Sequence, residues 1–193
     1  MNNSQKTRCS WVGELPIYID YHDNEWGRPV HDDAKLFEML ILEGMQAGLS
    51  WITVLKKREA FREAFDGFDY HKISLYSEEK LEELMKNEKI IRNRLKIKSV
   101  VSNAKAFLSV IEKYGSFDNF IWEYVNHTPF ISNWTSVEEI PATTAVSDKI
   151  SKDLKKIGFK FVGSTIIYSF MQATGMVNDH ITECFVYKET AQL

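Results

Sequence analysis

The sequence is poor in cysteine and has no long apolar run. Cys9 and Cys184 are the two cysteines among 193 residues, and nothing in the sequence points to an oxidising compartment, so we do not expect a disulfide between them. No run approaches the ~18 apolar residues of a transmembrane helix. Met1 to Arg8 contain no apolar stretch that could serve as a signal peptide. These absences predict a cytoplasmic protein that does not enter a membrane.

The chain also lacks a net positive charge, because 27 acidic residues outnumber 24 lysines and arginines and give a net charge of −3 at pH 7. The whole molecule therefore gives no sign of a polyanionic partner, and basic residues matter only where they cluster. Residues 86–105 and residues 149–160 are locally basic, with Glu88 and Asp153 as their only acidic residues. Each stretch is either a phosphate-contacting surface or an ordinary solvated helix face, and both interpretations stay open. The basic residues are Lys86, Lys89, Arg92, Arg94, Lys96, Lys98 and Lys105, and then Lys149, Lys152, Lys155, Lys156 and Lys160.

Strand-like alternation is scarce, and there is no repeat, low-complexity tract or linker. Helical periods run through most of the chain, so we predict an all-α fold in a single domain over residues 1–193. Pro129 and Pro141 bracket a stretch that we expect to be irregular. The expected helices run from Asp32–Asp33 to Gly48, from Ser50 to Asp66–Gly67, from Ser77 onward, through Leu95 and Leu108, from Ser116 to Val125, from Ser147 to Gly158, and from Ser164 to Gly175.

One cysteine and one histidine lie near each end of the chain. Cys9 and His22 stand at the amino end, and His180 and Cys184 at the carboxyl end. Two cysteines and two histidines are a ligand set for a tetrahedral structural zinc site, and a helical turn would point His180 and Cys184 the same way. Such a site would fasten the first residues to the last. The alternative is two buried, reduced thiols.

Glu43 shares a helical stripe with Leu36, Leu40 and Ala47. A carboxylate on an apolar stripe is costly unless it is paired or faces a polar ligand. The turn that follows can bring Trp51 beside Glu43. An indole and a carboxylate together could hold a flat heterocycle that bears an amino group. In the alternative interpretation, Glu43 lies at the edge of the stripe and reaches solvent.

The segment Gly158–Gly163 separates two expected helices. A short turn bounded by glycines exposes backbone N–H groups, and the dipole of the following helix also favours an anion. This is the physical basis on which a helix-hairpin-helix element grips one DNA strand without reading its sequence. We therefore expect Lys160, Gly163, Ser164 and Thr165 to contact DNA. An ordinary αα-hairpin is the alternative.

Seven segments together make the chain resemble the DNA-3-methyladenine glycosylase I family of bacterial base-excision repair. They cover nearly the whole chain in order: residues 9–12 (CSWV), 21–27 (YHDNEWG), 36–43, 46–58 (QAGLSWITVLKKR), 158–163 (GFKFVG), 168–173 (YSFMQA) and 177–180 (VNDH). The resemblance implies an all-helical member of the helix-hairpin-helix glycosylase superfamily, with the hairpin over about residues 147–175. It implies a monofunctional enzyme that flips 3-methyladenine out of alkylated double-stranded DNA and removes it hydrolytically.

The resemblance also assigns site residues. It implies a structural zinc ion that clips residues 9–22 to residues 180–184. It implies an aromatic base pocket in which Tyr21 and Glu43 form hydrogen bonds to the base and act in catalysis, while Trp51 stacks on it. A monomer that releases free 3-methyladenine and needs no membrane is expected. The implied zinc ligands are Cys9, His22, His180 and Cys184, and the implied pocket residues are Trp11, Tyr18, Tyr21, Trp26, Glu43 and Trp51.

One position departs from the wider superfamily, which usually carries a catalytic aspartate where this chain has Asn178. Asn178 cannot ionise or act as a general base, although the resembled family shares this lack; a part for Asp179 is left open. No lysine is identifiable that could form a Schiff base, so strand cleavage is not expected. Three alternatives remain: a glycosylase that also removes 3-methylguanine or 7-methylguanine, a non-catalytic binder of damaged DNA, and a zinc hydrolase. Four protein ligands to zinc argue against the last.

Overall fold

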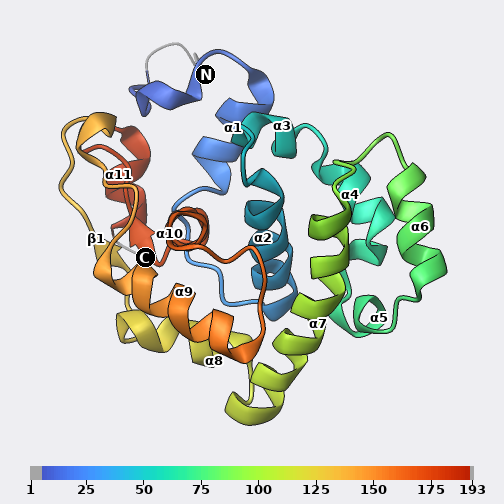
Figure 1. Ribbon diagram of the computed structural model, residues 1–193. Coiled ribbons are helices and arrows are strands. Elements are labelled where there is room, and N and C mark those ends of the chain that lie inside the picture. Colours follow the sequence, from blue (N-terminus) through green and yellow to red (C-terminus); the bar gives the residue numbers. More distant parts are fainter. Residues whose placement is uncertain (1–5, 192–193) are drawn as a thin grey trace.

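The computed structural model describes residues 6–191, which are mostly helical (Figure 1). The one exception is a parallel pairing of two-residue strands, in which Phe130 lies opposite Val177 and Ile131 opposite Asn178. The elements in chain order are η2 (Ser10–Val12), α1 (Pro16–Asn24), α2 (Asp33–Gln46), α3 (Trp51–Leu55), α4 (Arg58–Ala64), η3 (Asp66–Phe68), α5 (Tyr70–Ser74), α6 (Glu78–Lys86), α7 (Arg94–Tyr114), α8 (Phe117–Trp122), η4 (Glu123–Val125), β1 (Phe130–Ile131), η5 (Val137–Glu139), α9 (Ala145–Ile157), α10 (Ser164–Ala173), β2 (Val177–Asn178) and α11 (Phe185–Thr190). No helix in this described part is both long and apolar enough to cross a membrane.

Several helix limits follow from side-chain caps that the sequence predicted. Asp32 accepts the backbone N–H of Lys35 at the start of α2, and Ser77 accepts that of Lys80 at the start of α6. Gly158 ends α9 with a φ of +116°, a left-handed conformation that favours glycine. These limits are confirmed.

The prediction of one helix from Trp51 to about Phe65 is wrong. Lys57 has φ −103° and ψ 1°, outside the helical region, and separates α3 from α4. The Oγ of Ser50 lies 2.8 Å from the Oγ1 of Thr53 and caps no backbone group. After the break, Arg58 makes two 2.7 Å hydrogen bonds to Glu25, and Phe61 is fully buried. Past the break, α4 thus contributes an ion pair to the end of α1 and an aromatic ring to the core.

The predicted caps of α9 and α10 also need correction. Thr144, not Ser147, caps α9, and the two form a reciprocal capping box. Ser147 lies in the first turn, where its Oγ is 2.8 Å from the Oγ of Ser164. Ser164 is the first residue of α10, and Gly163 holds its N-cap position without a side-chain bond. The two hydroxyls therefore tie the starts of α9 and α10 together.

The central helix α2 carries the site, and it packs against α10, α3 and α7. Every residue from 36 to 45 in this helix is buried, which is the pattern of a helix surrounded by protein. Figure 1 shows α2 and α10 side by side, with the amino-terminal segment and α11 at the same end of the molecule. Glu43 therefore stands on a core helix, beside α10. The assignment of a single domain stays a prediction.

Candidate functional site

A cavity of about 330 Å³ opens between α1, α2, α3, α10 and the segment that includes η5. All six residues that the sequence proposed for a pocket line it, and residues of α2, of α10 and of the segment around η5 complete the wall. The lining residues are Trp11, Tyr18, Tyr21, Trp26, Glu43, Gln46, Trp51, Val137, Ile140, Pro141, Ala142, Thr165, Tyr168, Ser169 and Gln172.

Glu43 and Trp51 present unpaired polar atoms in this wall. Glu43 is 3% exposed, so the interpretation in which it reaches solvent is wrong. Its Oε2 and the Nε1 of Trp51 are the two buried side-chain polar atoms without a hydrogen-bond partner in the described chain. Burial raises the pKa of Glu43 to about 8. Buried polar atoms are almost always paired, and these two, one oxygen and one N–H donor, are available to a ligand in the cavity.

The rest of the cavity wall is largely aromatic. The rings of Tyr21 and Trp51 are tilted by 45° with centroids 5.3 Å apart, and Trp11 meets Tyr18 and Trp26 edge to face at 5.1 Å. Burial and then the Glu43 charge raise the pKa values of Tyr18 and Tyr21, which keeps both phenols neutral. The cavity therefore offers flat apolar surfaces with a few polar atoms, as sites for planar heterocycles do.

The four predicted metal ligands come together in one buried cluster. One ligand atom from each of Cys9, His22, His180 and Cys184 lies within 4.8 Å of every other. The Sγ of Cys184 is 3.5 Å from His22 Nε2 and 3.5 Å from His180 Nδ1, and the Sγ of Cys9 is 3.7 Å from His180 Nδ1. Tetrahedral zinc, with bonds of about 2.3 Å to sulfur and about 2.1 Å to nitrogen, implies a sulfur–nitrogen edge of about 3.6 Å. The cluster thus has the size of a tetrahedral metal site.

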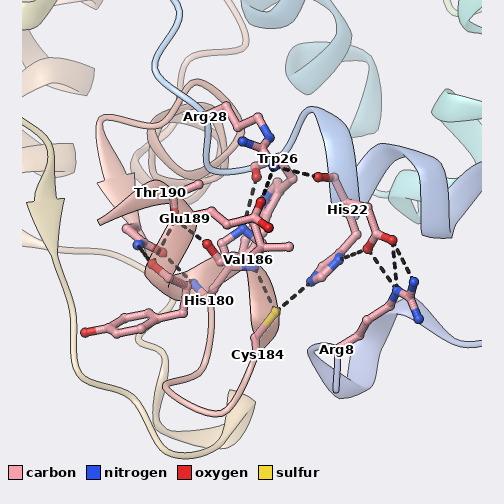
Figure 2. A network of polar contacts seen from close by, with 12 residues as sticks. Arg8, His22, Trp26, Arg28, His180, Cys184, Val186, Glu189 and Thr190 are labelled. Atoms are coloured by element: carbon pink, nitrogen blue, oxygen red, sulfur yellow. Dashed lines mark hydrogen bonds and ion pairs between the residues drawn. The ribbon is translucent and has the colours of Figure 1, made fainter. Parts of the chain in front are cut away.

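The groups behind these ligands also suit a metal ion. His22 contacts Asp23 through Nδ1 at 2.8 Å, and Arg8 holds the Asp23 carboxylate (Figure 2). His180 contacts the carbonyl of Trp26 through Nε2 at 3.0 Å. Each imidazole is thereby oriented with its other nitrogen toward the cluster, as metal-binding histidines are. His180 and Cys184 converge through a turn, because Cys184 precedes α11 and its N–H bonds to Ile181; their placement on one helical turn is wrong.

The turn between α9 and α10 is held from behind by α7. The side-chain oxygen of Asn103 accepts the N–H of Lys160 at 2.7 Å, and its amide donates to the Lys160 carbonyl at 3.0 Å. Phe161 has a φ of +55°, which is uncommon outside glycine. The Lys160 side chain is exposed, and Gly163 has open space at its Cα. The turn is thus rigidly placed, with its basic side chain in solvent.

Comparison with known proteins covers nearly the whole chain. The model of the methyladenine glycosylase family matches residues 11–187. The DNA-3-methyladenine glycosylase 1 of Escherichia coli (strain K12) is 54% identical over 180 residues, which are 93% of this chain and 96% of that protein. The chain belongs to the methyladenine glycosylase family.

Solved structures of this family have the same fold. A crystal structure of 3-methyladenine DNA glycosylase I is 56% identical with a TM-score of 0.90, over 93% of this chain and 98% of that one. A single-residue variant of a 3-methyladenine DNA glycosylase I, in complex with 3-methyladenine, is 36% identical with a TM-score of 0.90, over 92% of this chain and 96% of that one.

Sequence reasoning missed the side of this methyladenine glycosylase cavity that α10 forms. Thr165, Tyr168, Ser169 and Gln172 follow an i, i+3, i+4, i+7 pattern, so they share one face of α10. That spacing was visible in the sequence, but nothing marked the face as polar lining, because tyrosine and glutamine also occur on ordinary helix surfaces. Thr165, which the sequence proposed as a DNA contact, lies in the first turn of α10 and also lines the cavity.

The two basic stretches differ in how many of their basic side chains are paired with acidic groups or buried. In residues 86–105, Arg92, Arg94 and Lys98 pair with glutamates, and Lys96 is buried with its Nζ on the carbonyls of Met45 and Ala47. This pairing favours the solvated helix face for the first stretch. In residues 149–160 all five lysines are exposed, and Lys149 and Lys156 share Asp153 as their ion-pair partner.

Proposed function

We propose that this protein is a DNA-3-methyladenine glycosylase. It would turn the damaged nucleotide out of alkylated double-stranded DNA and hydrolyse its glycosidic bond, which releases free 3-methyladenine and leaves an abasic site. One observation carries the proposal: Glu43 Oε2 and Trp51 Nε1 are buried without partners in an aromatic cavity. A flat base with an amino group would satisfy the carboxylate and stack on the rings. The choice of 3-methyladenine as the base is supported by the relatives, which are named for it, and by the similar structure that was solved with 3-methyladenine bound.

The substrate explains why the site needs little catalytic machinery. Methylation at N3 gives adenine a positive charge in the nucleotide, so the base leaves as a neutral molecule through a bond that is already weak. The protein has to turn the nucleotide out, which costs roughly a few kcal/mol, hold the base, and stabilise a sugar with oxocarbenium character. Hydrogen bonds and stacking in the cavity supply the binding energy for these tasks.

Glu43 and Tyr21 are the proposed hydrogen-bonding partners of the base, and Trp51 the stacking one. With a pKa of about 8 the Glu43 carboxyl is largely neutral in the empty cavity at pH 7, and a cationic base favours its charged form. A carboxylate that held the cation equally in ground and transition states would not lower the barrier. We therefore assign Glu43 chiefly to recognition of the amino group.

No general base is proposed at the position where the superfamily has an aspartate. Asn178 is 1% exposed; its amide donates to the carbonyl of Tyr187, and its Oδ1 accepts the N–H of His180. These bonds support a structural role beside the cluster. None of the described residues that line the cavity is a lysine. We accordingly propose a monofunctional glycosylase without Schiff-base chemistry or strand cleavage.

We propose that the Cys/His cluster holds zinc and that this zinc is structural. The ligand types, the spacing of the ligand atoms and the oriented imidazoles support the assignment. Bound zinc would supply a cross-link between residues 9–22 and residues 180–184. Four protein ligands leave no open position for a reacting water, which argues against a zinc hydrolase.

We propose that the hairpin grips one DNA strand through its backbone. The N–H groups at the start of α10 and the exposed Lys160 are suited to phosphate oxygens. Gly163 and Ser164 would lie along that strand, while Thr165 would connect it to the cavity. A grip by one hairpin on one strand is compatible with a monomer.

A wider substrate range is a second candidate, and the raised pKa of Glu43 favours it. A charged carboxylate would repel the O6 of 3-methylguanine or 7-methylguanine, but a neutral one can donate a hydrogen bond to it. The two candidates differ in how excision of methylguanine depends on pH. The narrow enzyme leaves methylguanine in DNA at every pH, whereas the wider one removes it better below pH 8.

Single-turnover excision by Glu43→Gln tests the proposed function. The matched control is Glu38→Gln, which changes another buried glutamate of α2 that pairs with Arg62 outside the cavity. At an enzyme concentration below saturation, where loss of recognition lowers the rate, we expect Glu43→Gln to slow 3-methyladenine release by about tenfold or more and Glu38→Gln to leave it near the wild-type rate. Equal rates for wild type and Glu43→Gln would remove Glu43 from the reaction.

A further inference from the structure

A buried carboxylate lies directly behind the α10 side of the cavity. Asp179 is fully buried and accepts four hydrogen bonds. Its Oδ1 accepts from Ser132 Oγ at 2.6 Å and Trp134 Nε1 at 2.9 Å. Its Oδ2 accepts from Tyr168 Oη at 2.6 Å and Gln172 Nε2 at 2.8 Å. Two of these donors, Tyr168 and Gln172, line the cavity.

The direction of these bonds sets what the cavity wall can do. A phenol has one proton, and that of Tyr168 is committed to Asp179. The Tyr168 oxygen can therefore only accept a hydrogen bond from a ligand in the cavity. One N–H of Gln172 is committed in the same way, which fixes the orientation of its amide.

We infer that Asp179 is a positioning residue that makes the α10 wall electron-rich by holding Tyr168 and Gln172 as donors to itself. This inference rests on the proposed function. An acceptor oxygen in the wall favours positive charge, whether on the methylated base or on a sugar with oxocarbenium character. The effect is present before substrate arrives, because Asp179 is held from its other side by Ser132 and Trp134. Electron-rich side chains fixed in advance need no rearrangement during the reaction.

Asp179→Asn reverses this polarity without removing an atom from the wall. The indole N–H of Trp134 can only donate, so the oxygen of the new amide would face Trp134 and its NH₂ group would face Tyr168 and Gln172. Both of those side chains can turn to accept, and Tyr168 would then point its proton elsewhere. We expect a folded protein whose excision of 3-methyladenine at saturating enzyme falls by about tenfold or more, with DNA affinity nearly unchanged.

Two further variants separate this role from a merely structural one. Thr174→Ala removes another buried hydroxyl, at the end of α10, which bonds to the carbonyl of Phe170 outside the Asp179 network and the cavity lining; we expect it to excise near the wild-type rate. In a Tyr168→Phe background, Asp179→Asn should cost much less than it does alone, because the hydroxyl through which it acts is gone. Metal content and melting temperature, measured for each variant, report structural damage independently of excision.

The outcomes are distinct. Excision by Asp179→Asn at the wild-type rate would overturn the inference. It would also be overturned if the rate loss of the Asp179→Asn, Tyr168→Phe double variant equalled the product of the two single-variant losses, because the two residues would then act independently. Equal losses in Thr174→Ala and Asp179→Asn would also overturn it, since Asp179 would then act through general stability. If Asp179→Asn fails to fold or to hold metal, Tyr168→Phe decides alone: it keeps three of the four bonds, and wild-type excision by it would refute the inference. Failure of the wild-type protein to release any base would instead refute the proposed function.

Discussion

Trp26 and His180 join the cavity to the Cys/His cluster. The Trp26 carbonyl lies 3.0 Å from Nε2 of His180, and the two rings meet edge to face with centroids 4.6 Å apart. Trp26 lines the cavity, while His180 contributes a ligand atom to the cluster. The position of one cavity wall therefore depends on how His180 is held.

Removal of a metal ligand should affect both sites. Cys9→Ser is expected to lower the zinc content and the melting temperature, because metal binding contributes directly to folding stability. It should also weaken binding of free 3-methyladenine, measured by tryptophan fluorescence, because Trp26 loses its fixed partner. Wild-type protein treated with a chelator is the control and should show the same changes. Full zinc retention by Cys9→Ser would contradict the cross-link between the chain ends.

Gly27 tests the same junction sterically. A Cβ at Gly27 would lie 2.8 Å from Nε2 of His180, and its φ is +77°. Gly13 also has a positive φ, +60°, but open space at its Cα, so Gly13→Ala is the matched control. Both substitutions should cost about 1 to 3 kcal/mol through the backbone, measured by chemical denaturation. Only Gly27→Ala should lose metal as well; equal metal content in the two variants would be evidence against the contact.

The buried Glu43 should make stability fall as pH rises. Its folded pKa is raised to about 8 from 4.5. Between these values the unfolded chain has released the proton that the folded chain retains, so increasing pH favours unfolding. Glu43→Gln cannot titrate. The free energy of unfolding of Glu43→Gln, relative to that of wild type and measured by chemical denaturation, should therefore increase from pH 5 to pH 8 by on the order of a few kcal/mol. A constant difference over this range would show that Glu43 is not buried as an acid.

The hairpin turn should depend on Asn103. Asn103→Ala removes both hydrogen bonds to the Lys160 backbone, so we expect weaker binding of duplex DNA by about tenfold and unchanged binding of free 3-methyladenine. Ser102→Ala, which removes a bond within α7, is the control. Unchanged DNA affinity of Asn103→Ala, measured by fluorescence anisotropy, would separate the turn from DNA binding.

The sequence predicted most of the helices because caps and glycines act locally. Asp32, Ser77 and Gly158 determine helix ends through their own backbone neighbourhood, and these predictions are confirmed. The break at Lys57 was missed because residues 51–65 contain no proline or glycine to mark it, and the bond that Arg58 makes to Glu25 just after it joins residues far apart in the sequence. The pairing of β1 with β2 was missed because strands of two residues are too short to show an alternating pattern.

The site was predictable where a residue type conflicts with its surroundings. Glu43 attracted attention because a carboxylate on an apolar stripe needs an explanation, and its Oε2 has no hydrogen-bond partner among the residues that the structure describes. Tyr168, Gln172 and Asp179 gave no such signal, because their hydrogen bonds join α10 to the residues that follow it and to Trp134. Only the folded chain brings that network behind the cavity.

The most direct test of the central claim is to incubate the purified protein with methylated duplex DNA and identify the released bases by chromatography. The account predicts release of free 3-methyladenine, with abasic sites left in an unbroken strand. Release of 7-methylguanine in addition would support the wider range that a neutral Glu43 permits. Folded, zinc-loaded protein that releases no base would contradict the account and indicate a non-catalytic binder of damaged DNA.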